Sequence, residues 1–237
     1  MNQELMQLQV LSGGAAQGLV TALAPQFQAE TGCDIAATFG AVGAMRDKLI
    51  GGASADLLIL TSALIAELTK AGHVVAGSAA DLGTITTGVA VRHGDPLPAV
   101  GDADALRAAL RAADGIYFPD PKLATAGIHF AKVLERLGIA DAVKSKLKYS
   151  GGGLGGLAGT LVGNGEAEIG VQQISELMAA GGVDIVGPLP AELQNTTQFS
   201  AGVPVNAKAS EAGKALIAFL TTPAARSVLK AKGLEPN

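Results

Sequence analysis

The sequence is poor in residues that mark several classes of protein. Of its 237 residues none is tryptophan, only 3% are aromatic, and Cys33 is the single cysteine. One cysteine excludes an intramolecular disulfide, so Cys33 is expected to be a small buried hydrophobic residue. Few aromatic rings are available to stack on bases, and the net charge of −4 does not suit the neutralisation of phosphates. These absences argue against a nucleic-acid partner.

Long hydrophobic runs are also missing. No stretch approaches the roughly 18 consecutive apolar residues of a membrane span. Residues 1–6 lack the basic and apolar regions of a secretory signal. Two interpretations of the compartment stay open: a mature exported chain, which would be periplasmic, or a protein that starts at Met1 and stays in the cytoplasm.

Glycine and aliphatic residues are abundant instead. The chain has 32 glycines and 49% hydrophobic residues, which is enough for the core of one large domain or two small ones. Segments of strand type alternate with segments of helical spacing almost throughout. The alternation predicts an α/β protein with mainly parallel sheets flanked by helices.

The expected strands are residues 7–11, 34–39, 55–60, 84–92, 115–118, 167–172, 183–188 and 196–203. The expected helices are residues 16–30, 44–51, 63–71, 103–113, 127–137, 157–164, 174–180, 210–220 and 223–232. The strand at 55–60 is apolar throughout, so it should be central and parallel. Pro25 should kink the first helix or split off its last turn, Gly32 should end it, and Ser62 should cap the helix at 63–71.

Two long extended segments interrupt this alternation, and they predict paired crossovers between two lobes. Lobe 1 is expected to comprise residues 1–82 and 196–237, and lobe 2 residues 83–195. The hinge is expected near residues 82–92 and 190–203.

Glycine-rich turns join strands to helices at several places. In residues 8–18 a strand breaks at Ser12-Gly13-Gly14, and similar turns are expected at residues 40–43, 118–127 and 151–156. Such a turn leaves the first N–H groups of the helix unpaired and reachable, so an anion can bind there. The repeated design predicts one cleft in which several helix N-termini meet a small anion.

No strong catalytic signature accompanies these turns. The sequence has no Cys/His cluster at metal-ligand spacing, no Gly-x-Ser-x-Gly motif, no P-loop lysine and no G-x-G-x-x-G motif at the first turn. It therefore predicts neither a metal nor a cofactor.

The order of elements resembles the class II periplasmic solute-binding proteins, and within them the molybdate-binding branch of ABC transporter receptors. The resemblance covers nearly the whole chain and is carried by residues 10–17, 39–49, 55–59, 120–128, 165–174 and 215–233. It implies a two-lobe type II fold with two crossover hinge strands. It also implies a monomer that binds a small anion and serves an ABC transporter permease.

In the molybdate branch, two serine hydroxyls, backbone amides and a tyrosine hold the oxyanion. On this chain the serine positions fall on Ala15 and near Val42 or Gly43, and the tyrosine position falls on Gln173. All three hydroxyls are therefore missing. This departure from the family pattern favours a small organic carboxylate over molybdate.

Other groups could replace the missing hydroxyls, namely Ser12, Thr125, glutamine amides, backbone N–H groups and Arg46. The predicted ligand-binding residues are Ser12, Gly13, Gly14, Ala15, Gly40, Val42, Gly43, Arg46, Thr125, Ala126, Gln172 and Gln173. Structural alternatives stand beside them. The glycines could serve tight turns alone, Arg46 could be solvated, and the two adjacent glutamines should point to opposite faces of their strand.

A second interpretation is a cofactor-free isomerase of an unsaturated di- or tricarboxylate, a role that relatives of this receptor fold such as aconitate isomerase perform. It needs a base in the cleft, for which His129 and Asp120 are the candidates. The alternatives are a structural histidine on a helix face and an aspartate that braces the corner at residues 119–121. Glu176 is expected to cap its helix or to be solvated.

Overall fold

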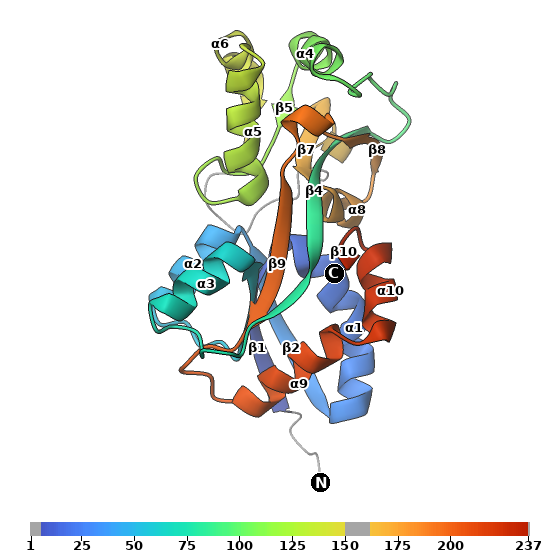
Figure 1. The fold of residues 1–237 in the computed structure, drawn as a ribbon. Helices are drawn as coiled ribbons and strands as arrows, with labels where there is room; N and C mark the ends of the chain where they lie inside the picture. The colour runs from blue at the N-terminus through green and yellow to red at the C-terminus, as the bar shows by residue number, and fades with distance from the viewer. Residues whose placement is uncertain (1–5, 150–161, 237) are drawn as a thin grey trace. The chain divides into compact units, whose positions relative to one another are not determined.

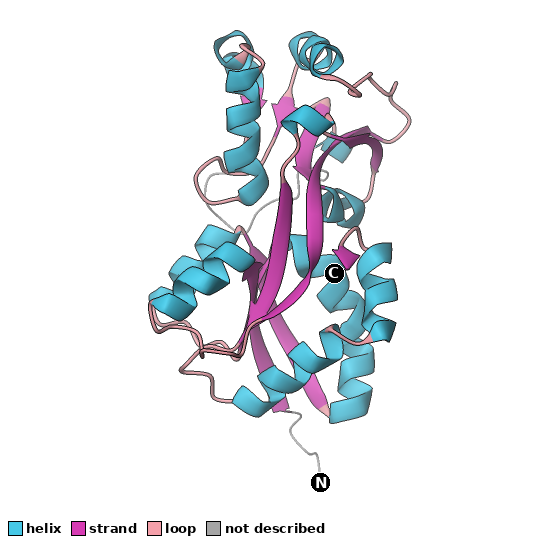
Figure 2. Cartoon of the chain, in the orientation of Figure 1, coloured by secondary structure: helices cyan, strands magenta, loops and turns pink. Residues whose placement is uncertain are grey.

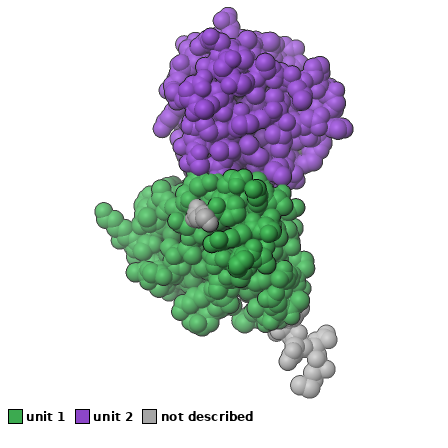
Figure 3. All heavy atoms as spheres, turned by 45° about the vertical axis from the view of Figure 1, so that its right-hand side comes forward, with its two compact units in different colours: residues 1–84, 197–237 green, residues 85–196 purple. Residues whose placement is uncertain are grey.

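Strands and helices alternate along the chain, as the hydrophobic pattern predicts. The computed structural model describes residues 6–149 and 162–236 (Figure 1). The chain forms two units, residues 1–84 with 197–237 and residues 85–196, coloured separately in Figure 3. It passes between them twice, within β4 (Ala80–Arg92) and β9 (Thr196–Gly202). None of the helices in these described ranges is long and apolar enough to cross a membrane.

In the sheet of unit 1, β1 lies between β2 and β3. Its strands are β1 (Met6–Gly13), β2 (Cys33–Gly40), β3 (Leu57–Thr61), β9, the start of β4 and β10 (Glu235–Pro236). β1 pairs in parallel with both β2 and β3, while β9 pairs antiparallel with β3. β3, whose residues 57–60 are buried, is therefore central as predicted, but it is parallel on one side only, because β9 belongs to the returning chain. β10 pairs antiparallel with β4, and its two residues are too few for any pattern to predict.

Helices flank the strands of this unit (Figure 2). They are α1 (Gln17–Thr31), α2 (Val42–Ile50), α3 (Ser62–Lys70), α9 (Ser210–Leu220) and α10 (Pro223–Ala231). Of the two alternatives expected for Pro25, a kink or a split, the split is wrong, since α1 continues through Pro25. Pro25 lies on the exposed face, where water can satisfy the carbonyl that loses its partner.

The ends of these helices test several expectations. Gly32 ends α1 with φ 72°, as predicted. Thr222 caps α10 by accepting the N–H of Ala225, which also agrees with the predicted start of that helix. Ser62 does not cap α3: Thr61 accepts the N–H of Leu64 instead, because the Ser62 hydroxyl is bonded to Asp81 and Ser200. Cys33 is buried, as expected.

Unit 2 contains a second sheet. Its strands are the remainder of β4, β5 (Ile116–Tyr117), β6 (Leu147–Lys148), β7 (Ile169–Gln173) and β8 (Val183–Pro188). β5 pairs in parallel with both β6 and β7, while β4 pairs antiparallel with β7 and β8. The helices are α4 (Ala103–Ala112), α5 (Thr125–Arg136), α6 (Ala140–Val143) and α8 (Ile174–Ala180).

The core of unit 2 is mainly aliphatic, with Phe118 and Phe130 in an edge-to-face contact at a centroid distance of 5.3 Å. α5 begins at Thr125, two residues before the expected start, so Thr125 and Ala126 belong to its first turn. The glycine-rich turn expected at residues 151–156 lies outside the described residues, as does most of the helix expected at 157–164.

Candidate functional site

Three of the strand-to-helix turns of unit 1 lie at one edge of its sheet. β1, β2 and β3 are parallel, so their carboxyl ends share that edge, and this is where α/β proteins bind ligands. Gly13 at the end of β1 pairs with Gly40 at the end of β2. A Cβ at Gly13 would lie 2.7 Å from Cγ1 of Val42, so the first two turns are in close contact.

This contact gives Gly13 a structural reason to be glycine. Its missing side chain leaves room for Val42 and Phe199, whose Cε1 would be 3.0 Å from a Cβ. At the second turn the first intrahelical bond of α2 runs from the N–H of Met45 to the carbonyl of Ala41 at 3.0 Å. The preceding N–H groups, from Val42 to Ala44, therefore have no acceptor within the helix and suit an anion.

The other ligand-binding residues predicted in unit 1 differ in whether their polar groups could reach a ligand. Ser12 has no exposed surface, and its hydroxyl donates to the carbonyl of Gly13 at 2.9 Å. Gly14 and Ala15 form the short 3₁₀ turn η1 (Gly14–Ala16) that precedes α1, and Ala15 is buried. A direct role for the Ser12 hydroxyl as a ligand donor is thus not favoured.

Arg46 makes a local ion pair. Its Nη2 lies 2.8 Å from Oδ1 of Asp47, with the two side chains 31% and 55% exposed. The hydrogen bond to Asp47 raises the pKa of Arg46. Exposed pairs of this kind contribute little stability, about 0–1 kcal/mol. The arrangement agrees with the solvated alternative for Arg46 and leaves the turns of unit 1 with neutral N–H donors.

Unit 2 has an equivalent edge at the carboxyl ends of the parallel strands β5 and β7. The chain leaves β5 through the corner at residues 119–121 and enters α5 at Thr125. Asp120 accepts the N–H groups of Lys122 at 2.7 Å and Leu123 at 3.1 Å, so it braces this corner. Gly127 packs on the same corner, since a Cβ there would lie 2.2 Å from the carbonyl oxygen of Pro119.

His129 serves packing in this unit. Its Nε2 lies 2.7 Å from the carbonyl oxygen of Leu193 and ties α5 to the turn η3 (Ala191–Leu193). Nε2 is the donor, because a carbonyl oxygen can only accept, and burial lowers the pKa of His129. His129 therefore makes a structural contact on a helix face and Asp120 braces the corner at residues 119–121, as their structural alternatives predicted. Neither residue is positioned as a free base.

Several polar side chains at the junction between β7 and α8 are buried. Gln172, Gln173 and Ser175 are 3%, 4% and 4% exposed. Nε2 of Gln173 and Oγ of Ser175 are buried and have no hydrogen-bond partner. A buried polar group without a partner costs about 1–3 kcal/mol, so this pair is unusual in a folded chain.

Glu176 completes the junction. It accepts hydrogen bonds from the side chain of Gln172 and from the backbone N–H of Gln173, which is the residue that precedes α8. Reaching back from the third helical position to this N–H is half of a capping box, which agrees with the first of the two alternatives expected for Glu176, a cap or a solvated side chain. Burial raises the pKa of Glu176 to about 7.

Sequence reasoning missed Ser175 and the Gln172–Glu176 contact. The available signal was the polar run Gln-Gln-Ile-Ser-Glu directly after a buried strand, with Gln172 and Glu176 four residues apart. The predicted residues of unit 1 lie together at one sheet edge, and those of unit 2 lie at another. That both edges face the same ligand stays a prediction.

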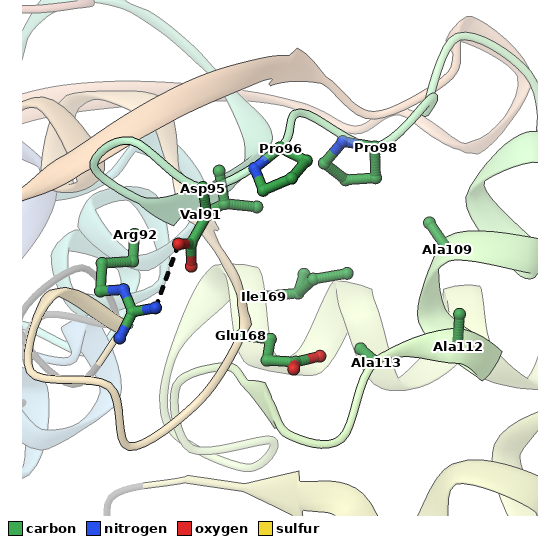
Figure 4. A pocket seen from close by; sticks show the side chains of 10 residues that line it. All are labelled: Val91, Arg92, Asp95, Pro96, Pro98, Ala109, Ala112, Ala113, Glu168 and Ile169. Carbon is green, nitrogen blue, oxygen red and sulfur yellow. Dashed lines mark hydrogen bonds and ion pairs between the residues drawn. The ribbon is translucent and has the colours of Figure 1, made fainter.

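A pocket of about 440 Å³ in unit 2 contains none of the predicted site residues (Figure 4). Its charged lining residues are engaged: Arg92 Nη2 lies 3.0 Å from Asp95 Oδ1, and Glu168 accepts the N–H of Asp114 at 2.8 Å. The rest of the lining is mostly apolar.

Within the described residues, no group of three or more His, Cys, Asp or Glu side chains could hold a metal ion.

Comparison with known proteins identifies the family to which this fold belongs. Residues 8–235 match the model for bacterial extracellular solute-binding proteins, so the chain belongs to that family. Within it, the chain is a class II solute-binding protein close to the molybdate-binding branch. The resemblance drawn from the sequence and the two-lobe type II α/β fold are both confirmed.

Individual relatives cover almost the full chain. An aconitate isomerase from a Pseudomonas species is 30% identical over 99% of this chain and 89% of its own length. The molybdate-binding protein ModA of Azotobacter vinelandii is 29% identical over 89% of this chain and 82% of its own length. Among solved structures, the periplasmic molybdate-binding protein of A. vinelandii superposes with a TM-score of 0.82 at 19% identity, covering 97% of this chain and 99% of that one. The sulfate-binding protein SubI of Mycobacterium tuberculosis gives 0.76 at 22% identity, covering 98% and 87%.

Proposed function

We propose that this solute-binding protein captures a small organic carboxylate rather than molybdate or sulfate, and that it delivers its ligand to an ABC-type permease. The observation that supports the ligand class most is the buried, unpartnered pair of Gln173 Nε2 and Ser175 Oγ. Both groups can donate, and a carboxylate is an acceptor with two oxygens. A bound carboxylate would therefore remove the penalty of these two unpartnered donors.

The donor chemistry favours this class of ligand. The positions at which the molybdate branch supplies hydroxyls hold Ala15, Val42 or Gly43, and Gln173 here, so the donors are amides and backbone N–H groups. Arg46 is occupied by Asp47, and the first turn of α2 offers uncharged N–H donors. Uncharged donors of this kind would suit the oxygens of a carboxylate group.

A ligand screen on the full chain tests the proposal. Thermal unfolding would be followed with succinate, citrate, trans-aconitate, molybdate and sulfate. A ligand at about 100 times its dissociation constant stabilises the folded protein by about 2.7 kcal/mol, which corresponds to roughly 5–10 °C in a chain of this size. We expect such a shift with a carboxylate. A shift with molybdate or sulfate and with none of the carboxylates would overturn the proposal.

A second candidate function is the isomerisation of an unsaturated di- or tricarboxylate. It is supported by the 30% identity to a Pseudomonas aconitate isomerase over nearly the whole chain. Both candidates need the same ligand class and differ in whether the bound molecule is converted. NMR of trans-aconitate incubated with the protein distinguishes them, because a receptor leaves the spectrum unchanged and an isomerase produces the cis isomer.

A further inference from the structure

The pocket in unit 2 is a cavity that the proposed function does not use. It has a volume of about 440 Å³, and none of the residues predicted to bind the anion line it. Pockets that hold small molecules measure about 300–1,000 Å³ and combine apolar walls with a few polar groups that orient the ligand. The pocket has such a volume and such a lining, so its residues indicate which kind of molecule fits it.

The walls of the pocket are built from small or donor-free residues. α4 contributes Ala109 and Ala112, which lie three positions apart on one side of the helix, while its leucines are buried in the core of unit 2. The loop before α4 contributes Pro96 and Pro98, whose nitrogens carry no hydrogen. Ile169, at the start of β7, lies between these walls in Figure 4. This part of the pocket therefore suits an apolar molecule.

The charged groups of the pocket leave one negative charge without a counter-charge. Arg92 and Asp95 neutralise each other through their 3.0 Å contact, which Figure 4 shows as a dashed line. Glu168 instead accepts the backbone N–H of Asp114 through Oε2 at 2.8 Å. In residues 6–149 and 162–236, no side chain forms an ion pair with Glu168. A carboxylate has about four acceptor positions, so Glu168 can accept a further donor.

The backbone around Glu168 holds its carboxylate at the pocket. The N–H groups of Glu168 and Ile169 both donate to the carbonyl of Gly115, at 3.0 and 3.1 Å. A Cβ at Gly115 would lie 3.2 Å from Cα of Ala167, so the two segments are closely packed. The bond from the Asp114 N–H then orients the carboxylate itself. An acceptor that is already oriented loses little conformational freedom when a ligand binds.

We propose that this pocket binds a small organic cation, whose ammonium or guanidinium group donates to Glu168 and whose apolar body packs on Ile169 and the alanines of α4. The uncompensated negative charge favours a cation over an anion, and a charged donor strengthens a hydrogen bond to a carboxylate. The apolar walls favour a hydrocarbon body over an inorganic ion. This inference is independent of the proposed function, because the two sites share no residue and take ligands of opposite charge.

Ligand-observed NMR titrations of the full chain test the role of the charge. The probes are 2-phenylethylamine and isopentylamine, with 2-phenylethanol as a neutral molecule of similar shape, and we expect both amines to bind more tightly than the alcohol. Glu168→Gln keeps an oxygen for the Asp114 N–H and removes the charge, so it should weaken amine binding about tenfold. Glu166→Gln is the matched control, since Glu166 is exposed and does not line the pocket, and it should bind the amines as the unaltered chain does.

A second pair of variants tests the location. Ala112→Leu places a larger side chain in the pocket and should weaken amine binding by about tenfold or more, because it occupies the space of the apolar body. Ala108→Leu, exposed on the same helix and outside the pocket, is the control and should leave amine binding unchanged. Leucine is almost as good a helix former as alanine, so both variants should fold, which circular dichroism checks.

Three results would overturn this inference. They are a failure of both amines to bind at millimolar concentration, equal affinities for the amine and the alcohol, and unchanged amine binding in Glu168→Gln or in Ala112→Leu. None of them concerns carboxylate capture, which the ligand screen decides separately.

Discussion

Replacing Gln173 with leucine should stabilise the ligand-free protein and weaken carboxylate binding. Nε2 of Gln173 is buried without a hydrogen-bond partner, and the residue is only 4% exposed. Leucine has a similar volume and brings no polar atom that needs a partner. Most core substitutions destabilise a protein, so an increase in stability at this position would be a specific sign of a binding residue.

The magnitude follows from the cost of the unpaired amide. Leaving a buried donor unsatisfied costs about 1–3 kcal/mol, and the substitution removes that cost. In a chain of this length 1 kcal/mol changes the melting temperature by roughly 2–4 °C, so an increase of about 2–10 °C is expected. Loss of one good hydrogen bond to a charged ligand group should weaken binding by about 1.5–3 kcal/mol, which is roughly tenfold to a hundredfold.

Gln194→Leu is the matched control, because the amide of Gln194 is fully used. Its Oε1 accepts the N–H of Thr87 at 3.0 Å and its Nε2 donates to the Thr87 carbonyl at 2.9 Å. Removing them leaves backbone groups unpaired and should lower the free energy of unfolding by about 2–4 kcal/mol. Differential scanning fluorimetry with and without a carboxylate measures both effects. If Gln173→Leu lowers the melting temperature as Gln194→Leu does, or keeps the ligand-induced shift, the reasoning about the unpaired donor is refuted.

Three further predictions concern other positions. Gly127→Ala should prevent α5 from packing, because a Cβ would lie 2.2 Å from the Pro119 carbonyl oxygen, and loss of soluble folded protein would be seen by circular dichroism. Asp56→Ala should cost about 3–5 kcal/mol in urea unfolding, since this buried carboxylate accepts three backbone N–H groups within 2.9 Å. Because the pKa of Glu176 is raised to about 7, its contribution to stability is present at acid pH and is lost as pH rises from about 4.5 to about 7. Urea unfolding across that range should show this loss in the unaltered chain and not in Glu176→Gln, whereas the lowered pKa of His129 acts equally in both.

Local chemistry explains which parts of the fold could be predicted from the sequence. The strand-to-helix alternation, the end of α1 at Gly32 and the start of α10 at Pro223 depend on residues close in the chain. Such signals act within one turn or one strand. The carboxyl edges of the parallel strands could be anticipated for the same reason, because each turn follows its own strand.

Other features depend on residues far apart in the sequence. Ser62 was expected to cap α3, but its hydroxyl is bonded to Ser200, 138 positions away. Pro25 is tolerated inside α1 because it faces solvent, which depends on how the helix packs. The pairing of β10 with β4 joins the end of the chain to its middle. Patterns within one segment carry no information about these contacts.

The candidate site could be predicted only as a set of turns. Gln173 was expected from its place at the end of a buried strand, but the sequence does not show that its amide lacks a partner while the neighbouring Gln172 bonds to Glu176. Likewise, Arg46 was a candidate because guanidinium groups bind carboxylates, and only the structure assigns it to Asp47. Whether a polar group is free to bind depends on every neighbour around it.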